Sequence, residues 1–344
     1  MNLTYTEIKG QYEAMARTME YADARLPEIA ALLTRCGQYM FMGCGSSYAV
    51  AASGAMIART RLCKPAMAVT AGDFLLHADT YRPMLEDCAL VALSRSGETS
   101  EIIRAVERAR AMGVSCRVLG VTCAEGSALA PLCDCVLEMP WAFDNSVCQT
   151  RTVSCLYLLC AYCAANMAGD ERLIADLRAA VSGGQAFMDG IERELETAAK
   201  GGWTHAVVLG DAELSGLCEE GALAFKEICQ VPSNHYHLLD VRHGPMVMIN
   251  KQTLVIAILS GADNKLELDV LRDITAKGAG VVAYSDEPLE MPGVLSVSFG
   301  RKLSHPARGI PAIAVCQLIS YYKSFQTGAD PDRPSGLSPW IELA

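Results

Sequence analysis

Residues 88–112 read CALVALSRSGETSEIIRAVERARAM, and their pattern indicates the fold class most clearly. Its first six residues are apolar and typical of a buried strand, and the next six, Ser94 to Thr99, form a polar turn that contains a glycine. The spacing of apolar residues then predicts an amphipathic helix from Glu101 to Met112. A buried strand, a tight turn and a helix are the building unit of a parallel α/β sheet.

The same unit recurs along the chain. An apolar run at Gln38–Met42 ends at Gly43-Cys44-Gly45-Ser46-Ser47, and a helix is predicted from Tyr48 to Arg59. Further strands are predicted at Cys116–Val121, His205–Leu209, Leu254–Leu259 and Gly280–Tyr284. The turns of the first half reappear about 165 residues later in the second half, which indicates an internal repeat of one α/β domain.

Long helical stretches separate the two series of strands. They are predicted at Thr152–Met167 and from Asp170 to about Lys200, and the domain boundary is placed between them. We therefore predict N-terminal helices in residues 1–34, a first domain in 35–170, a second domain in 195–330 and a C-terminal tail in 331–344.

Composition narrows the possible partners. The 344 residues are 51% hydrophobic with a net charge of −10, and no basic stripe offers itself to a nucleic-acid backbone. The N-terminus lacks the features of a secretory signal, and no apolar run reaches the length of a membrane span. The 15 cysteines fit buried thiols in a reducing compartment, so we expect a cytoplasmic protein that binds neither nucleic acid nor membrane.

Two serine-rich turns are the first candidates for a binding site. Ligands of open parallel sheets bind beyond the carboxyl ends of the strands, where helix N-termini attract anions. Five hydroxyls meet that description, from Ser46, Ser47, Ser94, Ser96 and Thr99. They suit a phosphate monoester, although capping helices is a commoner task for such residues. Neither GxGxxG nor GxxxxGK[ST] is present at these turns, and no cluster of metal ligands stands out, so we expect no cofactor and no metal.

Four motifs in order carry a family resemblance. They are residues 43–47, residues 94–99, Glu220-Gly221-Ala222-Leu223-Ala224-Phe225-Lys226-Glu227 and Arg242-His243-Gly244-Pro245. From about residue 5 to 337 the chain resembles the isomerase half of glucosamine-6-phosphate synthase and its sugar isomerase (SIS) relatives, which include phosphosugar isomerases, Amadori-product deglycases and aminosugar-phosphate deaminases. The resemblance implies an α/β fold of two tandem flavodoxin-like SIS domains, each a parallel sheet with helices on both faces.

The resemblance also implies residue roles. The hydroxyls of Ser47, Ser94, Ser96 and Thr99 would bind a sugar 6-phosphate, with Arg95 beside them. Glu227 would move a proton between C1 and C2, and His243, reaching in from the partner subunit of a homodimer, would assist ring opening. One carboxylate can perform that transfer through an enediol, and imidazole donates and accepts protons near neutral pH. Candidate sugar contacts are Gly45, Val147, Gln149 and Thr150.

Read without the resemblance, the catalytic candidates have ordinary alternatives. Glu227 could lie on the solvated face of a helix, and His243 could be a turn residue. In the second half, Leu259-Ser260-Gly261-Ala262-Asp263 has lost most of the hydroxyls found at Ser94–Thr99, so we expect one phosphate site per chain.

The chain also departs from the synthase. It lacks room for a glutaminase domain, so we expect no glutamine hydrolysis, and Pro339 stands where the synthase has a lysine near its C-terminus. The favoured hypothesis is an Amadori-type deglycase acting on a fructosamine 6-phosphate. A ketose-aldose phosphosugar isomerase, an aminosugar-phosphate isomerase or deaminase, and a non-catalytic sugar-phosphate sensor are the alternatives.

Overall fold

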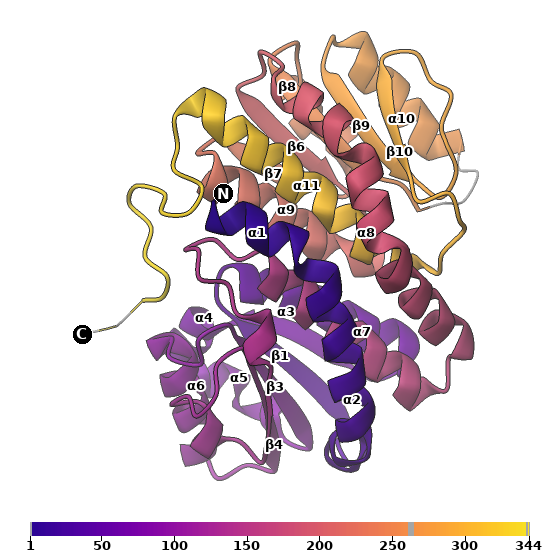
Figure 1. Ribbon diagram of the computed structural model, residues 1–344. Coiled ribbons are helices and arrows are strands. Elements are labelled where there is room, and N and C mark those ends of the chain that lie inside the picture. Colours follow the sequence, from indigo (N-terminus) through magenta and orange to yellow (C-terminus); the bar gives the residue numbers. More distant parts are fainter. Residues whose placement is uncertain (1, 261–264, 342, 344) are drawn as a thin grey trace. The chain divides into compact units, whose positions relative to one another are not determined.

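The computed structural model describes residues 2–260, 265–341 and 343. The chain forms two compact units, each with one five-stranded sheet (Figure 1). The first-sheet unit comprises residues 10–175 and 338–344, and the second-sheet unit comprises residues 1–9 and 176–337. The division falls inside the long helix α8 (Glu171–Ala199), and each unit is described by itself.

All strands of the first sheet are parallel, in the order β2-β1-β3-β4-β5. Every residue of the central strand β3 is buried, because helices cover both faces of the sheet. The strands are β1 (Gln38–Gly43), β2 (Ala66–Thr70), β3 (Cys88–Ser94), β4 (Cys116–Thr122) and β5 (Cys135–Glu138).

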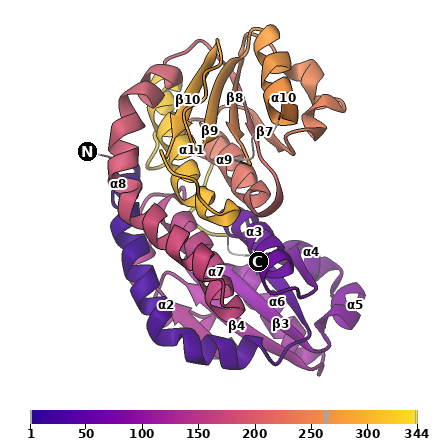
Figure 2. The ribbon, with the colours of Figure 1, turned by 90° about the vertical axis from the view of Figure 1, so that its right-hand side faces the viewer.

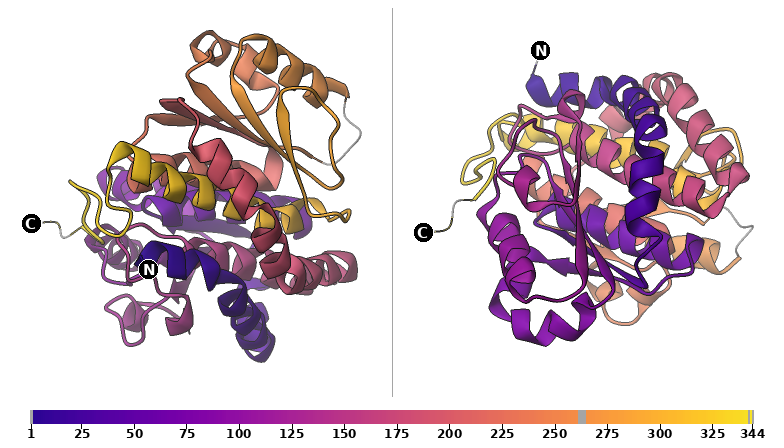
Figure 3. Two further views of the ribbon diagram at one scale, coloured as in Figure 1. Left: turned by 45° about the horizontal axis from the view of Figure 1, so that its top comes forward. Right: turned by 90° about the horizontal axis from the view of Figure 1, so that it is seen from below.

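Helices α2, α3 and α7 cover one face of this sheet, and α4 and α6 cover the other (Figure 2). Figure 3 shows the long indigo helix α2 from two further directions. Helix α6 buries Ile102, Ala105, Val106 and Ala109, a spacing that aligns them on one helical stripe. The helices are α2 (Gln11–Leu33), α3 (Ser46–Arg61), α4 (Ala71–Leu76), α5 (Ala78–Tyr81), α6 (Ser100–Ala111) and α7 (Arg151–Ala168).

The second sheet is also wholly parallel, in the order β10-β9-β8-β6-β7. Numbered along its own half of the chain, each sheet has the flavodoxin-like order 2-1-3-4-5. The predicted α/β fold with two parallel sheets is confirmed. The strands are β6 (His205–Leu209), β7 (Ser233–Tyr236), β8 (Thr253–Ile258), β9 (Gly280–Ser285) and β10 (Val294–Ser298).

Helix α10 packs on one face of the second sheet, and α9 covers the other face beneath α11. The N-terminal helix α1 also belongs to this unit, since the Thr4 amide donates to Asp332 Oδ1 at 2.8 Å and the Tyr5 hydroxyl donates to Glu192 Oε1 at 2.7 Å. The helices are α1 (Leu3–Lys9), α9 (Ser215–Ile228), α10 (Lys265–Ala276) and α11 (His305–Thr327).

The strands at the edges of both sheets were missed by the sequence reading. They are β2, β5, β7 and β10, and none of them is buried along its whole length.

Within the described part of the chain, no helix combines the length and apolar character needed to cross a bilayer.

Candidate functional site

The first serine turn lies between β1 and α3. A Cβ atom on Gly43 would overlap the backbone of Ser47, so only glycine allows the chain to fold back this tightly. Ser46 and Ser47 are the first residues of α3, and each is only 3% exposed. Their hydroxyls therefore lie at a helix N-terminus, where the helix dipole favours an anion.

The second serine turn lies between β3 and α6. Ser94 Oγ accepts a hydrogen bond from the Gly97 amide at 3.0 Å, and Ser96 Oγ accepts one from the Glu98 amide at 3.1 Å. A hydroxyl that accepts from an amide still has its own proton to donate. The loop thus fixes both oxygens while leaving two O–H groups able to bind an anion.

The two turns lie on one edge of the sheet. Strands β1 and β3 are parallel neighbours, with Met42 opposite Ala92, so their carboxyl ends and the turns that follow lie side by side. Thr99, the residue before α6, makes no capping hydrogen bond with its side chain. We call Ser46, Ser47, Ser94, Ser96 and Thr99 together the hydroxyl cradle.

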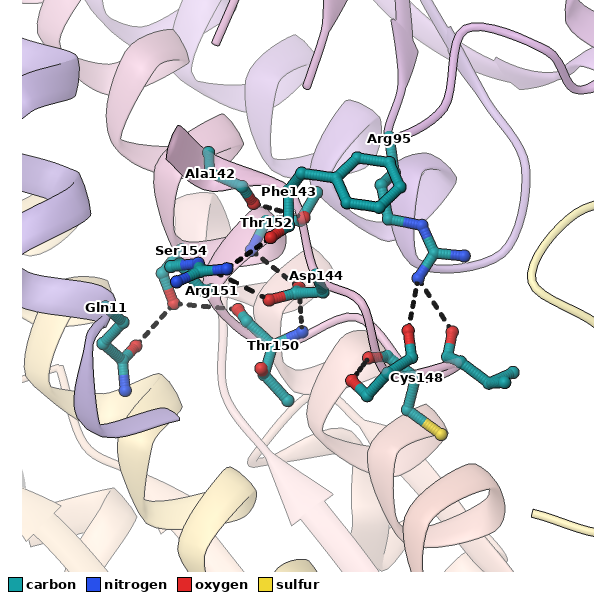
Figure 4. A network of polar contacts seen from close by, with 12 residues as sticks. Gln11, Arg95, Ala142, Phe143, Asp144, Cys148, Thr150, Arg151, Thr152 and Ser154 are labelled. Carbon is teal, nitrogen blue, oxygen red and sulfur yellow. Dashed lines mark hydrogen bonds and ion pairs between the residues drawn. The ribbon is translucent and has the colours of Figure 1, made fainter. Parts of the chain in front are cut away.

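Arg95 lies inside the cradle loop but is directed elsewhere. The residue is 3% exposed, and Nη1 of its guanidinium donates to the carbonyls of Ser146 at 3.0 Å and Val147 at 2.9 Å (Figure 4). Nη2 donates to the carbonyl of Pro339, and the Phe143 ring lies 5.8 Å from the guanidinium carbon. Since these nitrogens bind backbone carbonyls, a contact between Arg95 and a phosphate stays a prediction.

The loop that leads into α7 is fixed by a buried carboxylate. Asp144 Oδ2 accepts hydrogen bonds from the amides of Thr150 at 2.7 Å and Thr152 at 2.9 Å (Figure 4). Arg151 Nε lies 3.8 Å from Asp144 Oδ1. Sequence analysis did not single out Asp144 as the scaffold of this loop, because its bonds go to amides whose positions depend on the fold.

Three predicted sugar contacts, Val147, Gln149 and Thr150, lie in this fixed loop. The amide oxygen of Gln149 is buried, and within the described residues it accepts no hydrogen bond. Buried acceptors are rarely left unsatisfied, so this oxygen is suited to accept a hydrogen bond from a hydroxyl of a bound molecule. The fourth predicted contact, Gly45, is exposed with φ of 53°, next to Ser46 of the cradle.

The predicted acid–base residues lie in the second-sheet unit. Glu227 is half-buried in the last turn of α9. His243 is exposed, and its amide donates to the carbonyl of Asp240 at 2.8 Å in the turn that precedes Gly244. The cradle and these two residues thus belong to different units, and their joint action on one ligand stays a prediction.

A histidine–carboxylate pair that the sequence reading missed lies beyond β6 and β7. His237 Nδ1 is 3.0 Å from Asp211 Oδ1, which also accepts the Leu238 amide. Burial lowers the pKa of the neighbouring His235. The position of Asp211 two residues beyond the apolar strand β6 was the available signal. No group of three or more His, Cys, Asp or Glu among the described residues is arranged to hold a metal ion.

The two parallel sheets define a doubly wound α/β protein, and comparison with known proteins shows what the chain is similar to. Residues 32–165 match the family model of the SIS domain. This segment contains β1 to β5 and the whole hydroxyl cradle. The matched segment lies within the first-sheet unit.

Relatives of known sequence are similar over nearly the whole chain. Glutamine–fructose-6-phosphate aminotransferase (isomerizing) 2 of Homo sapiens is 25% identical over 90% of this chain and 47% of its own length. The isomerizing aminotransferase of Aeropyrum pernix is 27% identical over 98% of this chain and 56% of its own length. The chain thus spans about half the length of the curated relatives it matches.

Solved structures resemble the entire chain. Glucosamine-6-phosphate deaminase of Thermotoga maritima has a TM-score of 0.81 and 25% identity, and the match covers 99% of this chain and 100% of that one. Tagatose-6-phosphate ketose/aldose isomerase of Escherichia coli has a TM-score of 0.86 at 21% identity, covering 99% and 96%. The second likeness is one of fold.

Proposed function

We propose that the chain is a sugar-phosphate enzyme acting at C1 and C2 of a 6-phosphorylated ketose or ketosamine. The observation that carries this proposal is the hydroxyl cradle at the carboxyl ends of β1 and β3, where Ser94 and Ser96 keep their O–H groups available for a phosphate. Relatives named for fructose 6-phosphate, glucosamine 6-phosphate and tagatose 6-phosphate support a phosphorylated hexose as the ligand.

The proposed chemistry is proton transfer by Glu227. The carboxylate removes a proton from C1, next to the C2 carbonyl of the open-chain sugar, and an enediol or enaminol forms. The same carboxyl group returns the proton to C2. His243 assists ring opening beforehand by exchanging a proton with the ring oxygen and the anomeric hydroxyl, since an imidazole can both donate and accept a proton.

With a ketosamine as substrate, these proton-transfer steps result in deglycation. The enaminol carries nitrogen on C1, so protonation at C2 gives a C1 imine. Water hydrolyses the imine to an aldose phosphate and a free amine, with no oxidant and no added nucleophile. Pro339 at the position of the family's terminal lysine supports this choice, because proline has no side-chain amine for carbonyl chemistry.

We further propose a cytoplasmic homodimer with two SIS domains per chain. The identical strand order of the two sheets supports a second SIS domain in the second-sheet unit. Three exposed apolar side chains lie close to His243 in sequence, namely Leu239 at 41%, Val247 at 78% and Met248 at 64% exposure. A partner subunit that covered them would bring His243 to the subunit interface.

The test is incubation in deuterated water with fructosamine-type 6-phosphates, fructose 6-phosphate and glucosamine 6-phosphate. A deglycase releases amine from a fructosamine 6-phosphate and leaves deuterium at C2 of the aldose phosphate, without glutamine. Interconversion of ketose and aldose phosphates without amine release would replace the deglycase with an isomerase. Ammonia from glucosamine 6-phosphate alone would favour a deaminase, which the similarity to the Thermotoga maritima enzyme makes the second candidate.

A further inference from the structure

Arg95 connects three segments that are far apart in sequence. From the cradle loop its guanidinium donates to Ser146 and Val147, 51 and 52 residues away, and to Pro339, 244 residues away. We propose that Arg95 is a positioning residue that holds the C-terminal tail, described at residues 338–341 and 343, across the cradle loop and so retains a bound sugar phosphate. The retention part of this inference rests on the proposed function, whereas the holding of the tail does not.

The tail also binds the first turn of α6. The amide of Ser100, the first residue of that helix, donates to the Ile341 carbonyl at 3.3 Å. Ser100 Oγ accepts from the Leu343 amide at 3.2 Å, and Arg104 Nη2 donates to the Leu343 carbonyl at 3.1 Å. Ser100 follows Thr99 of the hydroxyl cradle directly. The tail therefore lies at the helix N-terminus that forms one wall of the cradle.

Arg95 is the best-buried anchor of this tail. The side chains of the tail contribute little packing to its attachment, since Trp340 remains 40% exposed and Ile341 remains 50% exposed. The other contacts of the tail, at Ser100 and Arg104, are exposed and compete with water. A charged donor that is 3% exposed makes a stronger hydrogen bond than a neutral exposed one.

Holding the tail should affect how long a ligand stays. A pinned tail has already lost its conformational freedom, so closing it over an occupied cradle carries a small entropic cost. Without Arg95 the tail must be ordered anew each time a ligand is enclosed. The ligand then leaves faster, and the effect appears in Kd and KM rather than in kcat.

The matched variants are Arg95→Gln, Arg95→Lys and a chain ending at Leu337, alone and combined. Arg108→Gln is the control, because Arg108 lies on α6, the helix that follows the cradle loop, and makes an exposed ion pair with Asp79 at 3.2 Å. Thermal unfolding verifies that each variant folds. If Arg95→Gln does not fold, Arg95→Lys, which keeps the charge but loses the planar fork, carries the test with the truncation.

The first readout is hydrogen exchange of the unliganded protein. Arg95→Gln should raise exchange in the tail peptide and at the start of α6 by about tenfold, the scale of a lost hydrogen bond from a buried charge. The exchange rate of the tail in Arg95→Lys should lie between those of Arg95→Gln and the native protein. In Arg108→Gln it should equal that of the native protein. Unchanged tail exchange in a folded Arg95→Gln would overturn the proposal, whatever the enzyme's function.

The second readout is fructose 6-phosphate binding by calorimetry. Arg95→Gln and the truncation should each weaken binding about tenfold, and the combined variant should be no weaker than either, because both remove one interaction. Full additivity would show that Arg95 acts on the ligand rather than through the tail, and would refute the retention part. If the native protein binds no sugar phosphate, the proposed function fails and retention fails with it, while the exchange result still decides whether Arg95 holds the tail.

Discussion

A Cβ atom on Gly97 would overlap the hydroxyl group of Ser127. Gly97 also has φ of 66°, a backbone region that side chains with a Cβ rarely adopt. The same atom would lie 3.0 Å from Thr122 Cγ2, so the cradle loop is pressed against the end of β4. The conformation of the loop that presents Ser94 and Ser96 thus depends on glycine, which has no Cβ atom, at position 97.

Replacing Gly97 by alanine should destabilise the fold and weaken phosphate binding. The positive φ alone costs about 1 kcal/mol, and the clash with Ser127 adds to it. Gly113→Ala is the control, because Gly113 has φ of 63° but open space around its Cβ position. Denaturant unfolding of both variants separates strain from clash, and equal losses of stability would contradict the contact described here.

Ser96→Ala and Thr99→Ala should weaken the binding of phosphorylated sugars. Each removes an O–H donor from the cradle, and a hydrogen bond to a charged group contributes about 1.5–3 kcal/mol. Binding of the dephosphorylated sugars should change little, and the exposed Ser115→Ala serves as control. Calorimetry with fructose 6-phosphate and fructose measures the difference, and equal losses for both ligands would remove the loop from phosphate recognition.

Glu227→Gln should leave folding and ligand binding nearly intact while turnover falls about a hundredfold or more, the scale of a lost acid–base group. Glu219→Gln is the matched control, since Glu219 is also half-buried on α9, about two turns earlier. Steady-state rates with the best substrate of the panel provide the measurement. Native turnover by Glu227→Gln would exclude this carboxylate as the proton carrier.

If His243 serves the partner's site, two inactive variants should complement each other. A heterodimer of Glu227→Gln and His243→Ala has one site with both groups intact, so mixing with subunit exchange should restore part of the activity. Val247→Asp should shift the protein toward monomer in analytical ultracentrifugation, because it charges an apolar side chain that is 78% exposed. Heterodimers without recovered activity would place both groups in one subunit's site.

Thiol labelling should begin at one position among the 15 cysteines. Cys63 is exposed, whereas burial raises the pKa of Cys44 to about 11 and of Cys160 to about 12. The thiolate is the reactive form, so these partly buried thiols stay protonated and react slowly at pH 8. Cys116 should follow Cys63, because a hydrogen bond from Cys88 lowers its pKa. Peptide mass spectrometry after brief iodoacetamide treatment checks the order, and Cys63→Ser should abolish the fast phase.

The sequence predicted the central strands because their burial is visible in composition. Strand β3 is buried at every residue, and only a continuous apolar run satisfies that environment. Strands at the edges of a sheet are only partly buried and do not require a continuous apolar run. Strand β7 (Ser233–Tyr236), for example, contains polar residues that gave no strand signal. The candidate hydroxyls could be named from sequence because each turn groups its serines within a few residues, and their role in phosphate binding stays a prediction.

Arg95 could not be interpreted from sequence in the same way. Its partners are backbone carbonyls at Ser146, Val147 and Pro339, and every residue type has such a carbonyl. From sequence alone, a guanidinium beside the hydroxyls of the cradle suggests a phosphate ligand, whereas in the fold it binds backbone carbonyls. The second-half turn is only partly comparable, because residues 261–263 lie outside the described part of the chain.

The second-sheet unit is built from two distant segments of the chain, and this has a consequence for biosynthesis. Helix α1 is hydrogen-bonded to Asp332, and Thr4 leaves the ribosome 328 residues before that partner. At about 5–20 residues per second, α1 therefore waits on the order of tens of seconds for its binding site to be translated. The first-sheet unit can collapse around its own continuous segment in that interval. Chaperones that bind exposed nascent segments would thus find α1 available during most of translation.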